Sequence, residues 1–555
     1  MIKKGMGIPS YYKKLLTTVP GLIKRGRPDA GIDWLFMDFN CLIYHCLHRA
    51  DTPVYPGEAG REEWEQQFIT AIVHYCLKVI KEVAPQSGVF IAIDGVVPMA
   101  KMRQQRLRRF KSIWLKKEEA KANANAKANT NGWDTNAITP GTLFMTKLHT
   151  GLADMIRHKG KSSWILSTSD QPGEGEHKLL AEWRSGKYQG HFAVYGLDAD
   201  LIVLSLLGQE QCQLSNEIWL FREEIEKGQI TYDAMGEEQF EWFSIHALRD
   251  WLSTEFSYDP LSEGQSILPR FQRGMDPQVK RQFILNYACA MSVLGNDFLP
   301  SSLGLKIREE GHAELLNLLR VQEPLVDSTT LEISLSGLTS LFARLVTQET
   351  DRIETYVAKK RMTARALAGT LCPLGDNNWP LAQVAEECLV NPANKRNLAT
   401  DWQTRYFQHF FPGYRTPAHR DAICESYLYG IQWIWAYYTG QTSSVCFNWY
   451  YPHSLPPLWE WIYTYLRARA LPTFPATISV RAEDIRPVEQ LTLVLPLESW
   501  SLIPPCKEKQ FPSLAPQFFP AAFSFESVGK RFFWECEAQI PMPSICELKG
   551  VLTPM

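Results

Sequence analysis

The stretch WLFMD at residues 34–38 is an apolar run that ends in a carboxylate, and GVFIAID at 88–94 repeats this pattern. Two more short apolar runs follow, SSWILS at 162–167 and HFAVYG at 191–196. Longer segments with helical periodicity lie between the runs, at 61–84, 101–119, 141–158 and 174–184. Near-continuous apolar strands that alternate with helices predict an α/β fold with a mixed, mostly parallel central sheet flanked by helices.

Length and composition predict a folded chain of two or three domains. The 555 residues exceed one ordinary core, and 45% hydrophobic with 21% charged residues is typical of a globular protein. We expect an α/β core over 1–306, a helical connecting region over 307–420 and a second region over 421–555. The second region combines an aromatic-rich segment with a Pro- and Phe-rich tail, which we expect to run as an extended wrap over another domain.

Other features bear on the compartment. The 12 cysteines contain no C-x-x-C pair, which favours free thiols in a reducing compartment. No apolar run reaches membrane-spanning length, and MIKKGMGIPSYYKKLL lacks the core of a signal peptide. We therefore expect an intracellular protein without a membrane partner, in the cytoplasm rather than the nucleus. Because the net charge is only −2, any polyanion site must be a local basic patch.

Carboxylates follow several of the apolar runs or stand in nearby turns. They are Asp38, Asp94, Glu174, Glu176, Asp198, Asp200 and Asp297. Taken singly, an Asp at a strand end is more often a helix cap or a turn residue than a ligand. Together, at the carboxyl ends of parallel strands, such groups would repel one another unless cations held them. Hard oxygen ligands favour two Mg²⁺ ions, with Mn²⁺ as a substitute, and this predicts a two-metal phosphodiesterase.

A basic block, AKMRQQRLRRFKSIWLKK at 100–117, begins soon after Asp94. Its residues at i, i+4, i+7 and i+8 share one helix face, and they are Lys101, Gln105, Arg108 and Arg109. Arginine forks, a lysine and an amide suit a terminal phosphate. The other cations, Arg103, Arg106, Lys111, Lys116 and Lys117, are expected to contact a nucleic-acid backbone. The alternative is a solvated basic helix or a localisation signal.

The segment 425–466 is densely aromatic, and aromatic faces stack on nucleobases. At helical spacing such residues are more often core, so we assign Trp433, Trp435, Tyr437 and Tyr438 to packing. Trp449, beyond the expected helix, remains the stacking candidate. For His177, beside Glu176, we expect a hydrogen-bonded neighbour of the site rather than a ligand or base.

Several of these motifs together resemble the Xrn family of 5′→3′ exoribonucleases. They include MGIPSYY, MDFN, AIDGVVPMAKMRQQRLRRF, ITPGTLFM, PGEGEHK, YGLDADLIVL and LGNDFLP, and later YGIQWIWAYYTG, NWYYPH, PVEQLTLVLP and GKRFFWECEAQIPMP. The resemblance implies a PIN-like 5′ nuclease core in which the seven carboxylates bind two magnesium ions. It also implies that Lys101, Gln105, Arg108 and Arg109 form a pocket for a 5′-monophosphate.

The chain departs from the family pattern in a few places. Where the family has a base-stacking His, this sequence has Tyr44, with His45 next to it; Tyr44 can still stack, with Trp449 as its partner. The family pattern starts at Met6, so translation can start at Met1 or Met6. The sequence ends soon after the second conserved region, which predicts a compact member without long carboxy-terminal extensions.

The resemblance and the residues converge on one prediction. We expect a processive, Mg²⁺-dependent 5′→3′ exoribonuclease that degrades single-stranded RNA with a 5′-monophosphate to mononucleotides, acting as a monomer. The alternatives are a structure-specific 5′ flap nuclease on DNA and a catalytically silent RNA-binding scaffold.

Overall fold

The computed structural model of this protein describes residues 10–122, 132–196, 198–212, 216–226, 229–257, 277–320, 323–367, 379–411, 413, 415–441, 445–473 and 480–553. Met1 and Met6, the two candidate start residues, lie outside these ranges.

A seven-stranded sheet in the order β1-β9-β6-β5-β2-β3-β4 forms the centre of the fold. Its strands are β1 (Ile23–Arg25), β2 (Trp34–Asp38), β3 (Gly88–Ala92), β4 (Trp164–Ser167), β5 (Phe192–Tyr195), β6 (Ile218–Glu223) and β9 (Phe240–Ser244). Strands β4, β3, β2, β5 and β6 pair in parallel, whereas β9 pairs antiparallel with both β6 and β1. The sheet is mixed and mostly parallel, as predicted.

The chain order places a topological switch point beside β2. From β2 the chain moves outward through β3 to β4, then returns to pair β5 with the other side of β2. In open α/β sheets, ligands bind outside the carboxyl ends of the strands at such a point. Residue Asp38 ends β2, so this carboxylate lies at the switch point.

All four predicted strands are confirmed, but the sequence pattern missed β1, β6 and β9. Strands β6 and β9 carry Arg222, Glu223 and Glu241 inside otherwise apolar runs, which hides their strand character. In the structure these charges are paired: Arg222 with Glu241, and Glu223 with two tyrosine hydroxyls. Two short antiparallel pairs lie outside the sheet, β7 (Ile225–Glu226) with β8 (Gln229–Ile230) and β10 (Phe525–Glu526) with β11 (Glu537–Ala538).

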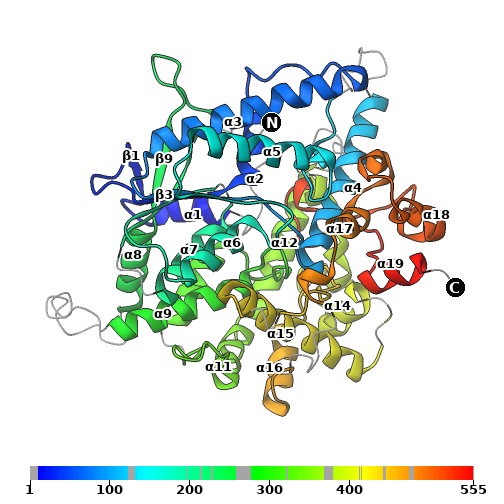
Figure 1. Ribbon diagram of the computed structural model, residues 1–555. Helices are drawn as coiled ribbons and strands as arrows, with labels where there is room; N and C mark the ends of the chain where they lie inside the picture. Colours follow the sequence, from blue (N-terminus) through cyan, green and yellow to red (C-terminus); the bar gives the residue numbers. More distant parts are fainter. Residues whose placement is uncertain are drawn as a thin grey trace.

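Alternate residues of the strands enter two cores, one on each face of the sheet. Leu35 and Met37 pack into the first core, while Phe36 between them packs into the second. The first core is covered by α2 (Phe39–Leu47), α3 (Arg61–Val83) and α5 (Leu143–Lys159). On the opposite face lie α1 (Tyr11–Thr18), α6 (Gly175–Arg184), α7 (Asp200–Gln211), α8 (Ile245–Ser257) and α9 (Pro277–Ala290). Figure 1 shows α3 and α5 on one side of the sheet and α6, α7 and α9 on the other.

The second core continues into a helical region that follows α9 in the chain. Its helices are α10 (Gly311–Leu319), α11 (Leu335–Val346), α12 (Glu349–Leu367), α13 (Trp379–Ala382), α14 (Trp402–Phe410), α15 (Pro417–Thr439) and α16 (Trp459–Ala468). The first and last parts of the aromatic-rich segment lie in α15 and α16, and α15 contacts α7. The aromatic segment is therefore joined directly to the α/β core.

The tail packs against α4 (Met99–Ala122), the helix that carries the basic block. It does so as a chain of short helices, including α17 (Pro487–Val494), α18 (Phe511–Leu514) and α19 (Ile545–Leu552). A third core forms between them, with Met102 and Phe110 of α4 against Leu493 and Phe519 of the tail. The sequence led us to expect an extended wrap, whereas the described part of the tail forms short helices that bury Leu493 and Phe519 against α4. In Figure 1 the orange and red segments lie beside α4.

Within the described ranges, no helix has the length and apolarity needed to cross a bilayer. The cysteines of those ranges are free thiols, in agreement with the prediction.

Candidate active site

The structure brings the seven predicted carboxylates together at the carboxyl edge of the sheet. Asp38 ends β2, Asp94 follows β3 and Asp198 follows β5. Three others belong to helix starts, Glu174 and Glu176 at α6 and Asp200 at α7. Asp297 arrives from outside the sheet, after the 3₁₀ turn Met291–Leu294. Each of the seven interacts electrostatically with at least one other of the set, so they form one acidic cluster.

Burial makes this cluster costly when it is fully ionised. Asp38 is 8% exposed, Glu176 6% and Asp200 4%. Burial first, and the neighbouring carboxylates second, raise the pKa of all three side chains well above the usual range. Burial also raises the pKa of Asp198, to about 6. Added positive charge would therefore stabilise the ionised form of these carboxylates.

One backbone amide, one side chain and one glycine hold the carboxylates at close range. The amide nitrogen of Gly175 donates to Asp94 Oδ1 at 2.7 Å, and Asn40 Nδ2 donates to Asp94 Oδ2 at 2.9 Å. A Cβ atom on Gly175 would lie 2.4 Å from Asp38 Oδ1. Glycine is required there because it lets the start of α6 approach the end of β2. Asn40 and Gly175 support the site without appearing among the predicted residues.

Lys101 reaches into the acidic cluster from α4. Its Nζ lies 2.6 Å from Glu174 Oε2 and 3.1 Å from Asp297 Oδ2. Burial alone would lower the pKa of Lys101, but Glu174 and Asp297 together raise it well above its usual range. The ammonium is thus a fixed positive charge shared by the acidic cluster and the basic helix.

The other three residues of the predicted helix face, Gln105, Arg108 and Arg109, follow Lys101 on α4. Gln105 and Arg109 are buried, and Gln105 Oε1 and Arg109 Nη1 have no hydrogen-bond partner. Burial lowers the pKa of Arg109 to about 10, so it stays cationic at neutral pH. Arg108 is close enough to Asp198 to lower the pKa of that carboxyl. A buried amide oxygen and a buried guanidinium N–H without partners are suited to an incoming polar ligand.

Of the remaining cations of the basic block, Arg106 contradicts the prediction of nucleic-acid contact. Its side chain is fully buried, and its three nitrogens donate to backbone carbonyls of the tail. Lys111 donates to the carbonyls of Trp534 and Cys536, and Arg103 pairs with Glu537 at 3.2 Å. Helical periodicity assigned these side chains to a different face but could not show that the tail covers it.

The aromatic residues assigned to packing are buried, as predicted, but Tyr437 also contacts the site. Its hydroxyl donates to Glu174 Oε1 at 2.8 Å. Its ring lies over His177, with centroids 3.8 Å apart and planes at 30°. Because burial lowers the pKa of His177 well below its usual range, this ring is neutral. Nothing local in the sequence marks Tyr437, which is 263 residues from Glu174.

The two stacking candidates occupy different surroundings. Tyr44 on α2 lies near Arg109 and influences the charge of that guanidinium. Trp449 is half-buried against Trp433, with ring centroids 5.2 Å apart, and it covers Gly430. The neighbouring His45 points into a buried network with Glu223 and Glu238, so it does not take the place of Tyr44. The stacking roles of Tyr44 and Trp449 stay predictions.

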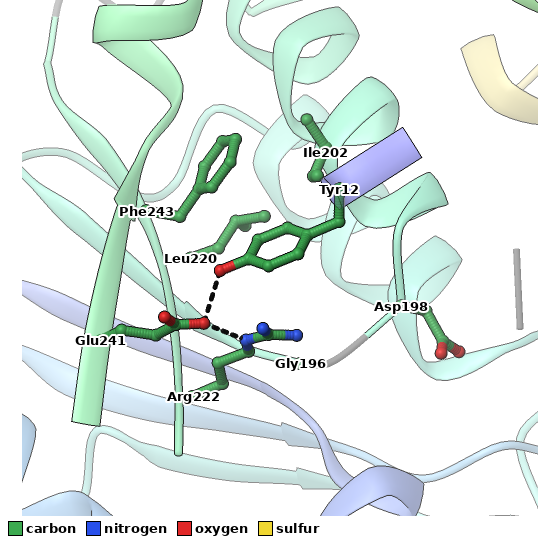
Figure 2. A pocket seen from close by; sticks show the side chains of 8 residues that line it. All are labelled: Tyr12, Gly196, Asp198, Ile202, Leu220, Arg222, Glu241 and Phe243. Atoms are coloured by element: carbon green, nitrogen blue, oxygen red, sulfur yellow. Dashed lines mark hydrogen bonds and ion pairs between the residues drawn. The ribbon is translucent and has the colours of Figure 1, made fainter. Parts of the chain in front are cut away.

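A small cavity of about 20 Å³ adjoins Asp198 (Figure 2), which is room for about one water molecule. Tyr12 and Arg222 both donate to Glu241 Oε1, at 2.5 Å each. The guanidinium of Arg222 lies 4.0 Å from the centroid of the Tyr12 ring. This triad docks α1 against β6 and β9 beside Asp198, a contact that the sequence motif around Tyr12 did not reveal.

The chemistry of the donor set fits divalent cations. The seven side chains offer hard oxygen ligands, the type that Mg²⁺ and Mn²⁺ prefer. One oxygen, Asp200 Oδ1, is buried without a hydrogen-bond partner. Oxygens of Glu174 and Glu176 and a ring nitrogen of His177 lie within 4.8 Å of one another. Lys101 compensates only part of the negative charge, so the cluster has ligands and charge for bound cations.

A parallel sheet with an acidic cluster at its carboxyl edge, and a basic helix beside that cluster, fits the class of α/β nuclease cores. Two family models match the sequence, the XRN 5′-3′ exonuclease N-terminus over residues 6–224 and the Xrn1 helical domain over residues 393–549. The chain belongs to the Xrn family.

Two of the relatives described here align with nearly all of this chain, and a third aligns with about half of it. It is 27% identical to human 5′-3′ exoribonuclease 1 over 97% of its own length and 33% of that protein. It is 25% identical to 5′-3′ exoribonuclease 2 of Gallus gallus over 99% of its length and 70% of the relative. With 5′-3′ exoribonuclease 1 of Saccharomyces cerevisiae the identity is 32%, over 56% of this chain and 20% of the relative. The chain thus spans about a third of the human relative.

Proposed function

We propose that this protein is a processive 5′→3′ exoribonuclease that degrades single-stranded RNA with a 5′-monophosphate to mononucleotides by two-metal-ion hydrolysis. The observation that carries the proposal is the acidic cluster joined to the basic face of α4 through Lys101. The names of the relatives, all 5′-3′ exoribonucleases, support the same activity. That the enzyme is processive, monomeric and cytoplasmic remains a prediction. The domain boundaries at residues 306 and 420 also remain predictions.

The seven carboxylates would hold two Mg²⁺ ions, with Mn²⁺ as a substitute. When bound, such ions lower the pKa of a coordinated water and stabilise the oxygen that leaves in an in-line displacement. The protein supplies the geometry: Gly175 and Asn40 hold Asp94, and Tyr437 holds Glu174. Because these bonds exist before any substrate arrives, the carboxylates need little reorganisation.

The basic face would select the end of the RNA. Arg109 Nη1 is a buried donor without a partner, Gln105 carries an amide N–H that can donate, and Arg108 lies near Asp198. A terminal monophosphate would bond to these groups, whereas a triphosphate or a cap is bulkier and differently charged. Lys101 would bind the same terminal phosphate. The scissile bond would then lie one nucleotide further along the RNA. Tyr44 and Trp449 would stack on terminal bases.

One digest tests the proposal and its rivals. Purified protein is incubated with 5′-monophosphate and 5′-triphosphate RNA of one sequence, with Mg²⁺ and with chelator, and with a DNA flap substrate. We expect mononucleotides from the monophosphate RNA in Mg²⁺ alone. Cleavage of the flap DNA in preference to RNA would point to a structure-specific nuclease, and RNA binding without products would point to a silent scaffold.

Tyr437→Phe should slow RNA hydrolysis about tenfold or more, because it removes a hydrogen bond to the Glu174 carboxylate. The matched control is Tyr427→Phe on the same helix, whose hydroxyl is buried without a hydrogen-bond partner. Initial rates on 5′-monophosphate RNA are compared after thermal unfolding has shown that both variants have the same melting temperature. Equal rates for the two variants would contradict a role for the Tyr437 hydroxyl.

A further inference from the structure

Arg106 is a fully buried cation on the helix that carries the basic face. Its Nη1 donates to the Leu493 carbonyl at 2.8 Å and its Nε to the Pro541 carbonyl at 3.2 Å, and Nη2 donates to the Phe518 carbonyl. The guanidinium also lies 4.6 Å from the ring centroid of Phe110 and 5.2 Å from that of Phe519. Five contacts therefore fix the position of one side chain.

The three carbonyls belong to separate parts of the C-terminal segment, which we define as residues 487–553. Leu493 lies in α17, Phe518 ends the 3₁₀ turn Pro516–Phe518, and Pro541 follows β11. A planar guanidinium can bond all three only if the parts keep their mutual arrangement. Arg106 thus joins the packing of the C-terminal segment to the orientation of α4.

Other hydrogen bonds join α4 and the residue Val97 before it to the C-terminal segment, on both sides of Arg106. Before α4, the Val97 amide donates to Gln490 Oε1 at 2.8 Å, and Gln490 is fully buried. One turn beyond Arg106, Lys111 donates to the Trp534 and Cys536 carbonyls. Contacts before and after Arg106 fix the position of α4 along its axis. Arg106, between them, fixes the rotation of α4 about that axis.

Rotation of α4 decides where the phosphate-binding face points. Successive residues of a helix differ by about 100° around the axis, so Arg106 lies on the face next to Gln105 and one turn from Arg109. A small rotation of α4 would move Gln105, Arg108 and Arg109 away from the acidic cluster together. A displacement of about 1 Å at a binding group can reduce a rate about 100-fold.

We propose that Arg106 is a positioning residue through which the C-terminal segment sets the preference of the enzyme for a 5′-monophosphate. This inference rests on the proposed function, because the preference itself belongs to that function. Arg106 does not touch RNA; it acts through Gln105, Arg108 and Arg109.

The experiment measures kcat and KM for Arg106→Met, Arg106→Lys and Phe519→Leu on 5′-monophosphate and 5′-hydroxyl RNA of one sequence. We expect kcat/KM on the monophosphate RNA to fall about 10- to 100-fold in Arg106→Met. The fall should appear mainly in KM, with less than about a threefold change on 5′-hydroxyl RNA. Arg106→Lys keeps the charge but not the three-way fork, so it should lose most of the preference as well.

Phe519→Leu provides the same test from the other side of the contact. Phe519 lies in the C-terminal segment and covers the guanidinium, and the exchange for leucine keeps an apolar core residue. We expect a smaller loss of preference, about threefold to tenfold, even if Arg106→Met fails to fold. The control is Lys121→Met, an exposed cation at the far end of the same helix, which pairs with Glu118.

The outcomes separate the inference from the proposed function. A wild-type enzyme that cleaves both RNAs equally overturns both. A wild-type enzyme that prefers the monophosphate, with folded Arg106 and Phe519 variants that keep this preference, overturns only the inference. An equal fall on both substrates also overturns it, because that result indicates a general structural defect. Binding of a 5′-phosphorylated oligonucleotide in chelator, measured by fluorescence anisotropy, should weaken in the same order as the preference.

Discussion

Asp200→Asn should reduce hydrolysis of 5′-monophosphate RNA about 1,000-fold or more while making the metal-free protein more stable. The loss follows because one proposed cation ligand is removed, and ligand loss at such a centre costs several kcal/mol of transition-state stabilisation. The gain follows because Asp200 is a buried carboxylate with an unpartnered oxygen among other carboxylates. We expect a higher free energy of unfolding in chelator at neutral pH than for wild type.

The sign of this gain depends on pH. Burial raises the pKa of Asp200 in the folded state above the ordinary value of 3.8. Protonated Asp200 therefore contributes stability below pH about 4, and this contribution is lost as pH rises through the folded-state pKa. The difference in melting temperature between Asp200→Asn and wild type should be small near pH 4 and should grow toward neutral pH. Thermal unfolding in chelator across this range measures it.

The control for Asp200→Asn is Asp170→Asn. Asp170 follows β4 near the same edge of the sheet, but its side chain is 78% exposed and lies 3.5 Å from His149, outside the acidic cluster. This variant should keep both the rate and the melting temperature of wild type. If Asp200→Asn degraded RNA as fast as Asp170→Asn, the assignment of the cluster to metal binding would be wrong.

Arg108→Ala combined with Arg109→Ala should weaken the preference for a 5′-monophosphate about 100-fold or more. Each arginine would contribute charge-assisted hydrogen bonds to the phosphate, worth about 1.5–3 kcal/mol apiece. A 5′-hydroxyl RNA lacks that phosphate, so its hydrolysis should change less than about threefold. The measurement is the ratio of kcat/KM for the two RNAs.

Removal of two positive charges could lower RNA affinity without any pocket, so the matched control is Lys159→Ala with Lys161→Ala. Both lysines are exposed at the end of α5 and carry no proposed role. The control should preserve the preference. An equal fall on both RNAs in the arginine variant would count against a phosphate pocket on α4.

Some features of the site follow from local sequence. Strands β2, β3, β4 and β5 are short apolar runs, and strand–helix alternation makes them parallel, so their carboxyl ends meet at one edge. Carboxylates that follow those runs must then gather, as the cluster around Asp38 shows. The shared face of Lys101, Gln105, Arg108 and Arg109 follows from helical periodicity alone.

Other features could not be predicted because they depend on segments far apart in the chain. Arg106 lies in the same local sequence pattern as its neighbours. It is nevertheless buried by parts of the C-terminal segment that lie 387 to 435 residues further along the chain. Tyr437 looks like one more core aromatic until α15 packs against α7 and its hydroxyl meets Glu174. Strands β6 and β9 are interrupted by charges whose partners appear only once the strands pair.

The sequence by itself therefore determined the parallel sheet, the carboxylates at its strand ends and the shared face of Lys101, Gln105, Arg108 and Arg109 on α4, because each depends on a pattern over a few residues. Only the tertiary structure decided which groups hold those elements in register: Tyr437 on Glu174, Tyr12 and Arg222 on Glu241, and the C-terminal carbonyls on Arg106. The physical reason is that a buried polar group must find a hydrogen-bond partner wherever the folded chain supplies one, and local pattern does not encode that partner.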